Sequence, residues 1–529
     1  MTGAAGSLPV LVVGAGPAGL TTATELLRRG VPVRCVDRAQ GPSTLSKALG
    51  LWPRTLELIR RVGGDELLSV RALPQSQMRY YSDGKVIANL RYRPATRPLI
   101  CPQPDVEEVL RTNLASVGGA PEWRTELLGF DQLADRVRAT LRGPDGTEST
   151  EDFSHLIGAD GASSTVRDRL GVDFTGSTYE LRFVVADVLV DTRLDHRMTH
   201  YFCSPRGILV ACGLPDGRWR VFTSAPPGLT QDEADLAAVQ RLVDERGPGG
   251  IALREPDWIS VFSVHARHAD TTRVGRVFLM GDAAHIHSPA GGQGLNTSVT
   301  DAHNLAWKLA LVWHGRSGDR LLDSYVSERG DVAKSVVRQA DVQTRIWLLR
   351  KGHQVALRDN ALRVASGLRL FDLAYVPWLA GLRTRYAAEP GAGRGRAGFV
   401  PGALVPLPLR SALDDLRHTL LVSDPDAGAL RSLVGWCEAE LAEVVDVRVV
   451  SGLGRRVAVL ARPDGHVDWT VKDDAAAMRA RLTDLFRPLL RTRQQASGER
   501  PRRHGDDGAR QAPSPHTEHT DEARQEVQA

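Results

Sequence analysis

Cysteine is scarce in this sequence, and the few copies form no recognisable pattern. The 529 residues include five cysteines, and no two of them make a Cys-x-x-Cys pair. Because an odd and scattered set fits neither a disulfide framework nor a zinc site, we expect neither, and the reducing cytoplasm is the expected compartment. We also see no spacing typical of any other metal site. The cysteines are Cys35, Cys101, Cys203, Cys212 and Cys437.

A long apolar run and a strong excess of charge are also missing. The apolar run near the N-terminus covers only residues 8–13, is followed at once by glycines and has no basic flank. Since a membrane-spanning helix needs about 20 apolar residues, this run predicts neither a signal peptide nor a membrane anchor. The net charge of +4 is small for the length, so neither nucleic acid nor an anionic membrane is an expected partner.

Near the N-terminus, the sequence predicts a strand, a helix and a second strand in close succession. Residues 9–13 are apolar, residues 20–29 have a helical Ala/Leu pattern, and residues 31–36 are apolar again and lead to Asp37. The string Gly-Ala-Gly-Pro-Ala-Gly at residues 14–19 joins the first strand to the helix. This order predicts the βαβ unit of a doubly wound fold.

Each glycine of this turn has its own task in a dinucleotide-binding unit. Gly14 permits the tight turn, Gly16 lets the backbone approach a pyrophosphate, and Gly19 lets helix and strand pack closely. The helix that starts near Pro17 offers unpaired N–H groups and its positive dipole end to the phosphates. At the end of the second strand, the carboxylate of Asp37 can accept both hydroxyls of a ribose.

The rest of the pattern predicts an inserted sheet and a separate C-terminal domain. Short alternating runs with turn signals predict an antiparallel sheet, and a Gly/Arg/Pro stretch after the following helices predicts a linker. That stretch contains a second Gly-x-Gly-x-x-Gly string, at residues 393–398, which we reject as a dinucleotide site because no strand precedes it and Pro401-Gly402 prevents a helix from following. The expected parts are residues 1–176 and 267–388 for the dinucleotide-binding domain, 177–266 for the inserted sheet, 389–408 for the linker, 409–493 for the C-terminal domain, and 494–529 for a polar, disordered tail.

Two further segments carry chemistry. Residues 156–167 combine an apolar strand, an Asp-Gly turn and a hydroxyl-rich helix start, in which Asp160 anchors the turn and Ser163 or Ser164 caps the helix. Residues 275–310 combine a strand ending at Gly281-Asp282 with a glycine-rich stretch and a long helix. Asp282 can accept hydrogen bonds from a polyol chain, and the glycines let backbone N–H groups approach the negative edge of a reduced flavin.

Taken together, these motifs closely resemble the group A, or aromatic-hydroxylase, flavoprotein monooxygenases. The resemblance rests on the glycine turn, on Asp160-Gly161, and on Gly281-Asp282 with the stretch from Pro289 to Asn296. It is supported by Gln103-Pro104-Asp105-Val106-Glu107 and by the pairs Ser324-Tyr325 and Glu328-Arg329, and it covers residues 8 to about 345. Residues 402 to about 490 also look like the thioredoxin-like C-terminal domain of larger members, although without a CxxC pair no redox activity is expected.

The resemblance implies a mixed α/β and α+β fold. A Rossmann-like FAD-binding domain would carry an inserted antiparallel-sheet substrate domain and a C-terminal thioredoxin-like domain. FAD is the implied cofactor and NADPH or NADH the implied co-substrate. The residues implied to bind these cofactors are Gly14, Gly16, Pro17, Ala18 and Gly19 at the pyrophosphate, Asp37 with Arg38 at the adenosine ribose, Gln103 and Lys47 on the flavin side, Asp160 near both cofactors, Asp282 at the ribityl chain, and Pro289, Gly292, Gly294, Leu295 and Asn296 along the isoalloxazine.

Lys47 is a departure from the family, in which many members have an arginine at this position. Lysine keeps the charge but loses the planar bidentate fork of arginine, which bears on NADPH affinity and on movement of the flavin. We assign no catalytic residue. His285 and His287 lie beside the glycine-rich stretch, and we interpret His285 as structural.

The implied activity is the transfer of one oxygen atom from O2, through a C4a-hydroperoxyflavin, to an aromatic substrate held against the inserted sheet, near residues 200–202 and 210–213. Lysine is rare and arginine abundant, as in proteins from GC-rich bacterial genomes. With the three-domain length, this composition favours a polycyclic aromatic polyketide of antibiotic biosynthesis as the substrate. A Baeyer–Villiger or drug-inactivating monooxygenase, and a flavin-binding protein without oxygenase activity, are the alternatives. The expected assembly is a monomer or homodimer.

Overall fold

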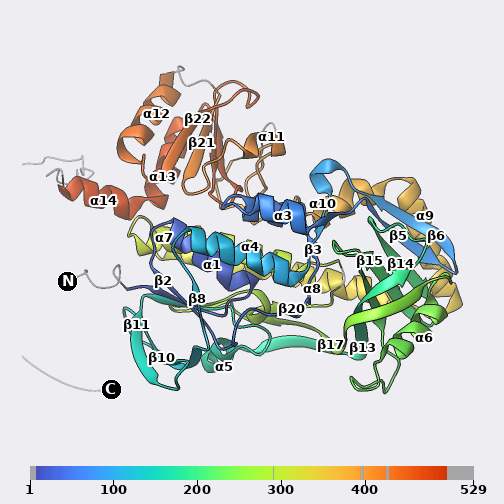
Figure 1. Ribbon diagram of the computed structural model, residues 1–529. Coiled ribbons are helices and arrows are strands. Elements are labelled where there is room, and N and C mark those ends of the chain that lie inside the picture. The colour runs from blue at the N-terminus through green and yellow to red at the C-terminus, as the bar shows by residue number, and fades with distance from the viewer. Residues whose placement is uncertain (1–7, 290, 394, 396–397, 424–427, 497–529) are drawn as a thin grey trace, which may run out of the picture.

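The computed structural model describes residues 8–289, 291–393, 395, 398–423 and 428–496. Most of the predicted tail and three residues of the rejected glycine string (394, 396 and 397) lie outside these ranges, as does Ala290. Figure 1 shows a central body with the two long helices α7 and α8, a second sheet at one end of it, and the C-terminal unit above the central helices.

A six-stranded sheet forms the centre of the first body, in the order β18-β19-β12-β1-β2-β8. All neighbours in it are parallel except β18 and β19. The predicted strand–turn–helix–strand unit is present as β1, α1 and β2. The bounds are β1 (Val10–Val13), α1 (Pro17–Arg28), β2 (Val33–Asp37), β8 (Pro121–Trp123), β12 (His155–Gly158), β18 (Arg273–Val274) and β19 (Val277–Leu279).

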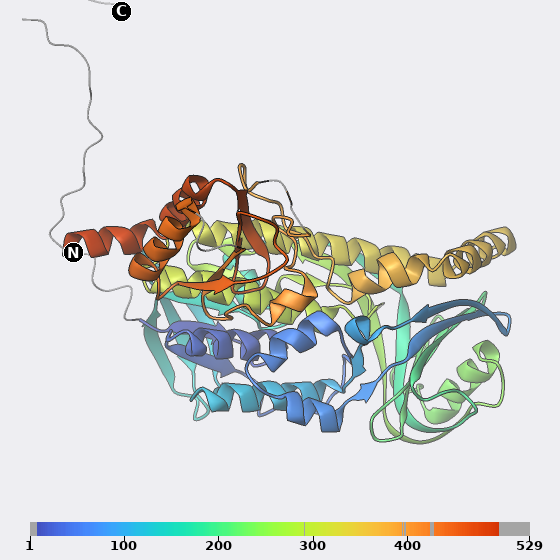
Figure 2. The same cartoon turned by 90° about the horizontal axis from the view of Figure 1, so that it is seen from above.

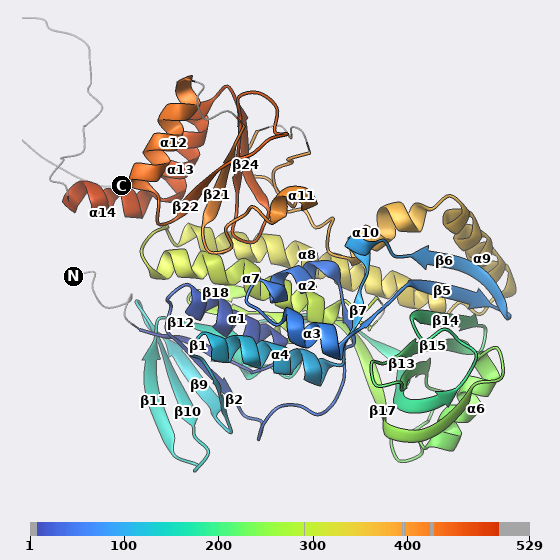
Figure 3. The same cartoon turned by 45° about the horizontal axis from the view of Figure 1, so that its top comes forward.

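Alternating side chains of β1 bury both faces of this sheet. Val10 and Val12 pack with the helices α1, α4 and α7, whereas Leu11 and Val13 pack with the small sheet β11-β10-β9. The two coverings lie on opposite sides in Figure 3. A strand buried on both faces is typical of a doubly wound sheet. The bounds are α4 (Gln103–Ser116), β9 (Glu126–Gln132), β10 (Val137–Arg142), β11 (Glu148–Phe153), α5 (Thr165–Leu170), η3 (Gly281–Ala283) and α7 (Gly294–Trp313).

An eight-stranded sheet forms the second body, in the order β20-β17-β13-β16-β15-β14-β5-β6. Helix α6 covers one face of it, and α8, α9 and α10 cover the other. The bounds are β5 (Gln77–Ser82), β6 (Lys85–Arg91), β13 (Phe174–Asp191), β14 (Met198–Ser204), β15 (Gly207–Gly213), β16 (Trp219–Ser224), α6 (Leu236–Arg246), β17 (Ala252–Ala269), β20 (His285–Ile286), α8 (Arg320–Trp347), α9 (Gly352–Gly367), η4 (Phe371–Tyr375) and α10 (Val376–Leu379).

This sheet corrects the predicted domain boundary. The hairpin β5–β6 comes from the first segment of the chain, outside residues 177–266, and β5 pairs with β14 in parallel, so the sheet is not wholly antiparallel. Pairing between segments so far apart leaves no trace in local alternation, which reports only that a strand exists. Between the two bodies lie β3 (Gly50–Leu51), α2 (Pro53–Arg60), α3 (Asp65–Arg71), β4 (Leu73–Pro74), η2 (Pro94–Thr96) and β7 (Leu99–Ile100).

The C-terminal unit is a four-stranded sheet in the order β22-β21-β23-β24, with α12 and α13 packed on one face. β21 and β22 are parallel and the other two pairs are antiparallel. Figure 2 shows this unit seated along the helices of the first body. The bounds are α11 (Leu407–Arg410), β21 (His418–Val422), α12 (Gly428–Glu440), β22 (Val445–Val449), β23 (Val457–Ala461), β24 (Val467–Lys472), α13 (Ala475–Leu485) and α14 (Arg487–Ala496).

Two expectations for this region need correction. The predicted linker is largely part of the C-terminal unit, because Phe399 and Val405 are buried against its sheet and the N–H of Val405 donates to the carbonyl of Gly465 at 3.0 Å. This stretch is rich in glycine and proline, but its few apolar residues are enough to pack it against the sheet of the C-terminal unit. Helix α14 also continues past the predicted boundary at Arg493 to Ala496. Within the described residues, no helix is long and apolar enough to cross a membrane.

Candidate functional site

The glycine turn lies between β1 and α1, and close contacts require two of its three glycines. Gly14 has a φ of +107°, and a Cβ there would lie 2.2 Å from the carbonyl oxygen of Ala159. A Cβ on Gly19 would lie 1.8 Å from the carbonyl oxygen of Gly14, whereas one on Gly16 would meet no atom within 4 Å. The protein's own packing therefore needs Gly14 and Gly19, and Gly16 faces open space.

A cavity of about 220 Å³ lies beside this turn. Helix α1 begins at Pro17, and its N-cap Gly16 provides no side-chain hydrogen bond to the first N–H groups. Unpaired N–H groups at the positive end of a helix bind anions, and here they border an open space. The cavity is lined by Val13, Gly14, Gly16, Asp37, Arg38, Thr125, Glu126, Leu127, Ala159, Asp160, Gly161 and Thr165.

Asp37 ends β2 and fixes the turn through the backbone. Its Oδ2 accepts the N–H of Ala15 at 2.7 Å, and its Oδ1 accepts the N–H of Ala39 at 2.8 Å. The sequence predicted a carboxylate at the cavity but gave no sign that both of its oxygens bind backbone amides. Arg38 beside it is exposed.

Asp160 anchors its turn as predicted, and Ser164 is the helix cap. Ser164 Oγ accepts the N–H of Arg167 at 3.0 Å and donates to Asp160 Oδ1 at 2.6 Å. Asp160 Oδ2 also accepts the N–H of Val166 at 3.1 Å. Burial raises the pKa of Asp160. The guanidinium of Arg167 donates to the carbonyl of Ala283 at 3.2 Å and so ties this motif to the Gly281-Asp282 segment.

Asp282 lies in η3, directly after the strand β19. Its side chain is exposed, yet the surrounding protein raises its pKa by desolvation, against the opposing effects of His285 and Lys47. Lys47, itself exposed, is therefore within electrostatic reach of this carboxylate. No hydrogen bond to another described residue occupies Asp282, so its oxygens are available to hydroxyl groups.

Gln103, at the start of α4, supports the segment that carries Lys47. Its Oε1 accepts the N–H of Ala48 at 3.1 Å, and its Nε2 donates to Glu107 at 2.9 Å. The backbone N–H of Gln103 also donates to Ser46 Oγ at 3.3 Å. The side chain of Gln103 thus orients the backbone next to Lys47.

Residues 289 and 291–296, which we call the flavin loop, lie just before α7 and in its first turn. Pro289 and Gly292 are exposed, and Leu295 is buried. Helix α7 begins at Gly294 without a side-chain cap, so its first N–H groups are free to meet negative charge. Contact of this backbone with a flavin ring stays a prediction.

A segment far away in the sequence holds the flavin loop. Asn296 Nδ2 donates to the carbonyls of Gly50 at 2.8 Å and Gly292 at 2.7 Å, and Asn296 Oδ1 accepts the N–H of Trp52 at 2.8 Å. Trp52 Nε1 donates to the carbonyl of Gly291 at 3.0 Å. The side chain of Asn296, predicted to line the isoalloxazine, is therefore used inside the protein, and sequence reasoning missed Trp52.

Asp301 organises a buried ionic cluster behind the Asp282 segment. Its Oδ2 is 2.8 Å from His285 Nε2 and accepts the N–H of Gly281 at 3.2 Å, while its Oδ1 accepts Arg329 Nε at 2.6 Å. Although burial opposes ionisation, Arg329 and His285 lower the pKa of Asp301. His285 is thus held by Asp301, which agrees with a structural role.

His287 has a different environment. Its Nδ1 is 2.8 Å from the carbonyl of Ser288, and its Nε2 is buried without a hydrogen-bond partner among the described residues. Burial lowers the pKa of His287 to about 4, so the imidazole is neutral at pH 7.

One face of the eight-stranded sheet carries aromatic rings that pack, for the most part, against α8, α9 and α10. Tyr80 stacks on Tyr201 at 4.6 Å between ring centroids, and Phe183 stacks on Phe222 at 4.8 Å. These rings belong to the same apolar cluster as Trp52, which bonds to the flavin loop.

The predicted substrate segments divide between the two faces of this sheet because side chains alternate along a strand. Tyr201 and Val210 belong to the aromatic face. Phe202 instead packs against α6 on the opposite face, where His200 Nδ1 lies 3.0 Å from the hydroxyl of Tyr81. Only alternate residues of the predicted segments belong to the apolar cluster that includes Trp52.

Comparison with known proteins identifies the family. A family model described as FAD binding domain matches residues 7–340. The chain belongs to this family and is a flavin-dependent monooxygenase. The 6-methylpretetramide 4-monooxygenase of Streptomyces rimosus is 37% identical over 450 residues, which cover 79% of this chain and 80% of that protein. A flavin-dependent monooxygenase of Mycobacteroides abscessus is 34% identical over 492 residues, which cover 87% of this chain and 96% of that protein.

A solved structure resembles this monooxygenase along most of its length. Aklavinone-11 hydroxylase, in a ternary complex with FAD and aklavinone, is 27% identical with a TM-score of 0.72, covering 91% of this chain and 99% of that one. The site fits FAD, because the monooxygenase has an open cradle of backbone N–H groups, a carboxylate at Asp282 that hydrogen-bonds no other described residue, and a second uncapped helix start at Gly294.

Proposed function

We propose that this monooxygenase consumes NADPH or NADH and hydroxylates a polycyclic aromatic polyketide in antibiotic biosynthesis. The observation that carries the proposal is the aromatic face of the eight-stranded sheet, which shares one apolar cluster with Trp52 of the flavin site. Phe222 and Phe262 of this face are only half-buried, and flat aromatic rings stack favourably on accessible aromatic side chains. Relatives named for 6-methylpretetramide and aklavinone support a polycyclic substrate.

The geometry supports distinct roles for the cofactor residues. Gly14, Gly16, Pro17, Ala18 and Gly19 would hold the FAD pyrophosphate, because Gly16 faces open space at the helix start. We assign Asp37 and Arg38 to the adenosine ribose, Asp160 to the same cavity, and Asp282 to the ribityl hydroxyls. The flavin ring would lie along the flavin loop, near Lys47 and the segment that Gln103 orients.

Bound FAD supplies the activation of O2 and the delivery of one oxygen atom. The residues of the chain bind and orient the reactants. The free N–H groups at the start of α7 favour negative charge on the adjoining ring. The neutral imidazole of His287 adds no positive charge there, and the apolar sheet face excludes water from the substrate. Lys47 is the nearby exposed cation that we propose for attracting the nicotinamide cofactor.

The architecture also supports the finer assignment of the domains. We assign the parallel six-stranded sheet to a Rossmann-like FAD domain and the eight-stranded sheet to the substrate domain. The order β22-β21-β23-β24, with one parallel pair followed by two antiparallel pairs, supports a thioredoxin-like C-terminal domain.

The test is single-turnover and steady-state oxidation of NADPH and NADH with a panel of aromatic polyketides under labelled O2. The expected product contains one labelled oxygen as a new hydroxyl group, with faster nicotinamide oxidation when the substrate is present. Simple phenols and rifamycin-like compounds are tested in parallel as alternative substrates.

Other outcomes would contradict the proposal in distinct ways. A product with a ring-inserted oxygen would indicate Baeyer–Villiger chemistry, and turnover of rifamycin-like compounds alone would indicate drug inactivation. If substrates bind but no oxygen is transferred, the chain is a flavin-binding protein without oxygenase activity.

A further inference from the structure

The C-terminal domain touches the FAD domain through a buried ionic turn. Residues 462–466 connect β23 to β24 and insert between α2 and the pair α7–α8. Arg462 donates to Glu328 of α8 at 2.6 and 2.9 Å, and Trp307 of α7 donates to Asp464 at 3.3 Å. Lys308 adds a 2.8 Å ion pair to Glu328. We call residues 462–466 the docking turn.

The first connection from the docking turn to the flavin loop runs through α2. The guanidinium of Arg54 donates to the carbonyl of Asp464 and forms a 2.8 Å ion pair with Glu57. Two residues before Arg54, Trp52 bonds both to Asn296 and to Gly291 of the flavin loop. Arg54 is buried at this domain interface.

The second connection runs through two successive residues of α8. Glu328 binds Arg462 of the docking turn, and Arg329 binds Asp301 at 2.6 Å. Asp301 in turn holds His285 and the N–H of Gly281, next to Asp282. The docking turn is thus linked to both segments that we assign to the flavin.

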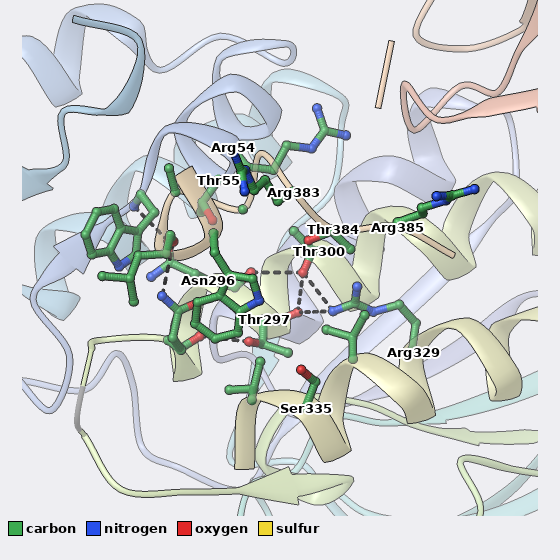
Figure 4. Close-up of a pocket in the computed structure, with 18 of the residues that line it drawn as sticks. Arg54, Thr55, Asn296, Thr297, Thr300, Arg329, Ser335, Arg383, Thr384 and Arg385 are labelled. Carbon is green, nitrogen blue, oxygen red and sulfur yellow. Dashed lines mark hydrogen bonds between the residues drawn. The ribbon is translucent and has the colours of Figure 1, made fainter. Parts of the chain in front are cut away.

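A cavity of about 260 Å³ lies between these connections (Figure 4). Asn296 and Gln293 line it on the side of the flavin loop, and Asp464 and His466 line it on the side of the docking turn. Arg54 and Arg329 both border it, and Arg329 donates to Thr300 across its floor at 2.9 Å. On the side of Gln293 and Asn296, the flavin loop borders this cavity rather than packed side chains. Its hydrogen bonds therefore matter more for its position than they would in a close-packed core.

We propose that the C-terminal domain positions the flavin loop through the docking turn, with Arg54 and Glu328 as the positioning residues. This inference rests on the flavin site proposed above and gives the domain, which has no CxxC pair, a task in cofactor binding. The domain acts from outside the site, since neither positioning residue lines the cavity beside the glycine turn.

The test compares Arg54→Met and Arg54→Lys with the wild-type full-length protein. Methionine keeps much of the volume but cannot donate to Asp464, and lysine keeps the charge with one point-like donor. We expect FAD binding to weaken about tenfold in Arg54→Met, equivalent to about 1.4 kcal/mol. Arg54→Lys should recover part of this loss. FAD affinity is measured by fluorescence titration of the apoprotein, and the circular dichroism of the bound flavin should change in parallel.

The matched control is Asp415→Asn. Asp415 forms another ion pair between the domains, at 2.6 Å from Arg28, but Arg28 is the last residue of α1, at the opposite end from the glycine turn. This variant should keep wild-type FAD affinity and flavin dichroism. Equal losses in Asp415→Asn and Arg54→Met would overturn the proposal, because any loosened interface would then suffice.

The remaining outcomes are also decisive. If Arg54→Met keeps the wild-type FAD affinity and flavin dichroism, the proposal that Arg54 positions the flavin loop is refuted. If Arg54→Met does not fold, the test relies on Arg54→Lys. Unchanged FAD affinity and flavin dichroism in Arg54→Lys then refute the proposal. The titration uses neither substrate nor nicotinamide, so failure of the proposed substrate leaves this result standing. A wild-type protein that binds FAD but forms no product would count only against the proposed function.

Discussion

The glycine turn and the flavin loop both present backbone where we place the cofactor, but the protein builds them differently. Within the βαβ unit of the turn, Gly19 lies against Gly14, and Asp37 binds Ala15, which is 22 residues away; the distant Ala159 adds a steric contact at Gly14. The flavin loop depends on Gly50, which is 246 residues from Asn296. The glycine turn is thus constrained mainly by steric contacts between backbone atoms, and the flavin loop by hydrogen bonds between distant segments.

This difference predicts two kinds of failure. At Gly14 or Gly19 an added methyl group collides with backbone atoms that cannot move independently, so we expect complete loss of the site. At the flavin loop each lost hydrogen bond removes part of the support, so the damage is graded.

Gly19→Ala should have the largest effect. Its Cβ would lie 1.8 Å from the carbonyl oxygen of Gly14, which forces β1 and α1 apart. We expect a protein with no bound FAD and a lowered unfolding temperature, measured by the flavin-to-protein absorbance ratio and by thermal unfolding.

Gly16→Ala sharpens this prediction, because its Cβ meets no protein atom within 4 Å. The apoprotein should unfold at the wild-type temperature, while FAD binding should weaken because the methyl group occupies the space assigned to the pyrophosphate. Unchanged FAD affinity would place the pyrophosphate elsewhere.

Glu328→Gln should change how stability depends on pH. Although burial opposes ionisation, Arg462 and Lys308 lower the pKa of Glu328 from 4.5 to about 2. A lowered carboxyl pKa stabilises the folded state above pH 4.5, and this contribution is lost as the pH falls toward 2. Over that window the wild type should lose up to roughly 3 kcal/mol more than the variant, measured by urea unfolding.

The control for this prediction is Glu438→Gln, at an exposed position of α12. Its pH dependence should run parallel to that of the wild type. If Glu328→Gln also runs parallel, the ionic contacts of the docking turn do not stabilise the fold.

Asn296→Ala should weaken the flavin loop by a smaller, graded amount. The variant loses the bonds to Gly50, Gly292 and Trp52, and we expect a loss of about 1–3 kcal/mol in the free energy of unfolding together with weaker FAD binding. Urea unfolding and FAD titration measure the two effects. Complete loss of folding would show that this loop is as intolerant as the glycine turn.

Phe222→Ala should have the smallest effect and extends the comparison to the eight-stranded sheet. Phe222 lies on the aromatic face and stacks on Phe183, so its loss should raise the KM for a polycyclic aromatic substrate about fivefold, with little change in kcat. Phe202→Ala is the matched control, because Phe202 packs against α6 on the other face. This control should lower stability and leave KM unchanged. Equal KM values for the two variants would exclude the aromatic face as the substrate surface.

Features made by neighbouring residues could be predicted from the sequence. The strand–turn–helix–strand unit, the anchoring role of Asp160 and the helical cap near Ser164 all follow from short patterns, and the structure confirms them. The strand β19 and the long helix α7, within residues 276–313, could also be predicted.

Features that join distant segments could not be predicted. Nothing in the local alternation of residues 77–91 shows that this hairpin completes a sheet whose other strands begin at Phe174. The glycines and prolines of residues 389–408 hide the docking of Phe399 and Val405. Likewise, no spacing reveals that Asn296 binds Trp52 or that Arg54 reaches Asp464.

The sequence by itself determined the dinucleotide unit and, with the later motifs, the flavin family. It could do so because a tight turn that needs glycine and the start of a helix each depend on a few neighbouring residues, which form a recognisable sequence motif. Only the tertiary structure decided which strands share a sheet, which side chains lie together on each sheet face and what holds the flavin loop. Those outcomes depend on hydrogen bonds and ion pairs whose partners meet only when the whole chain has folded.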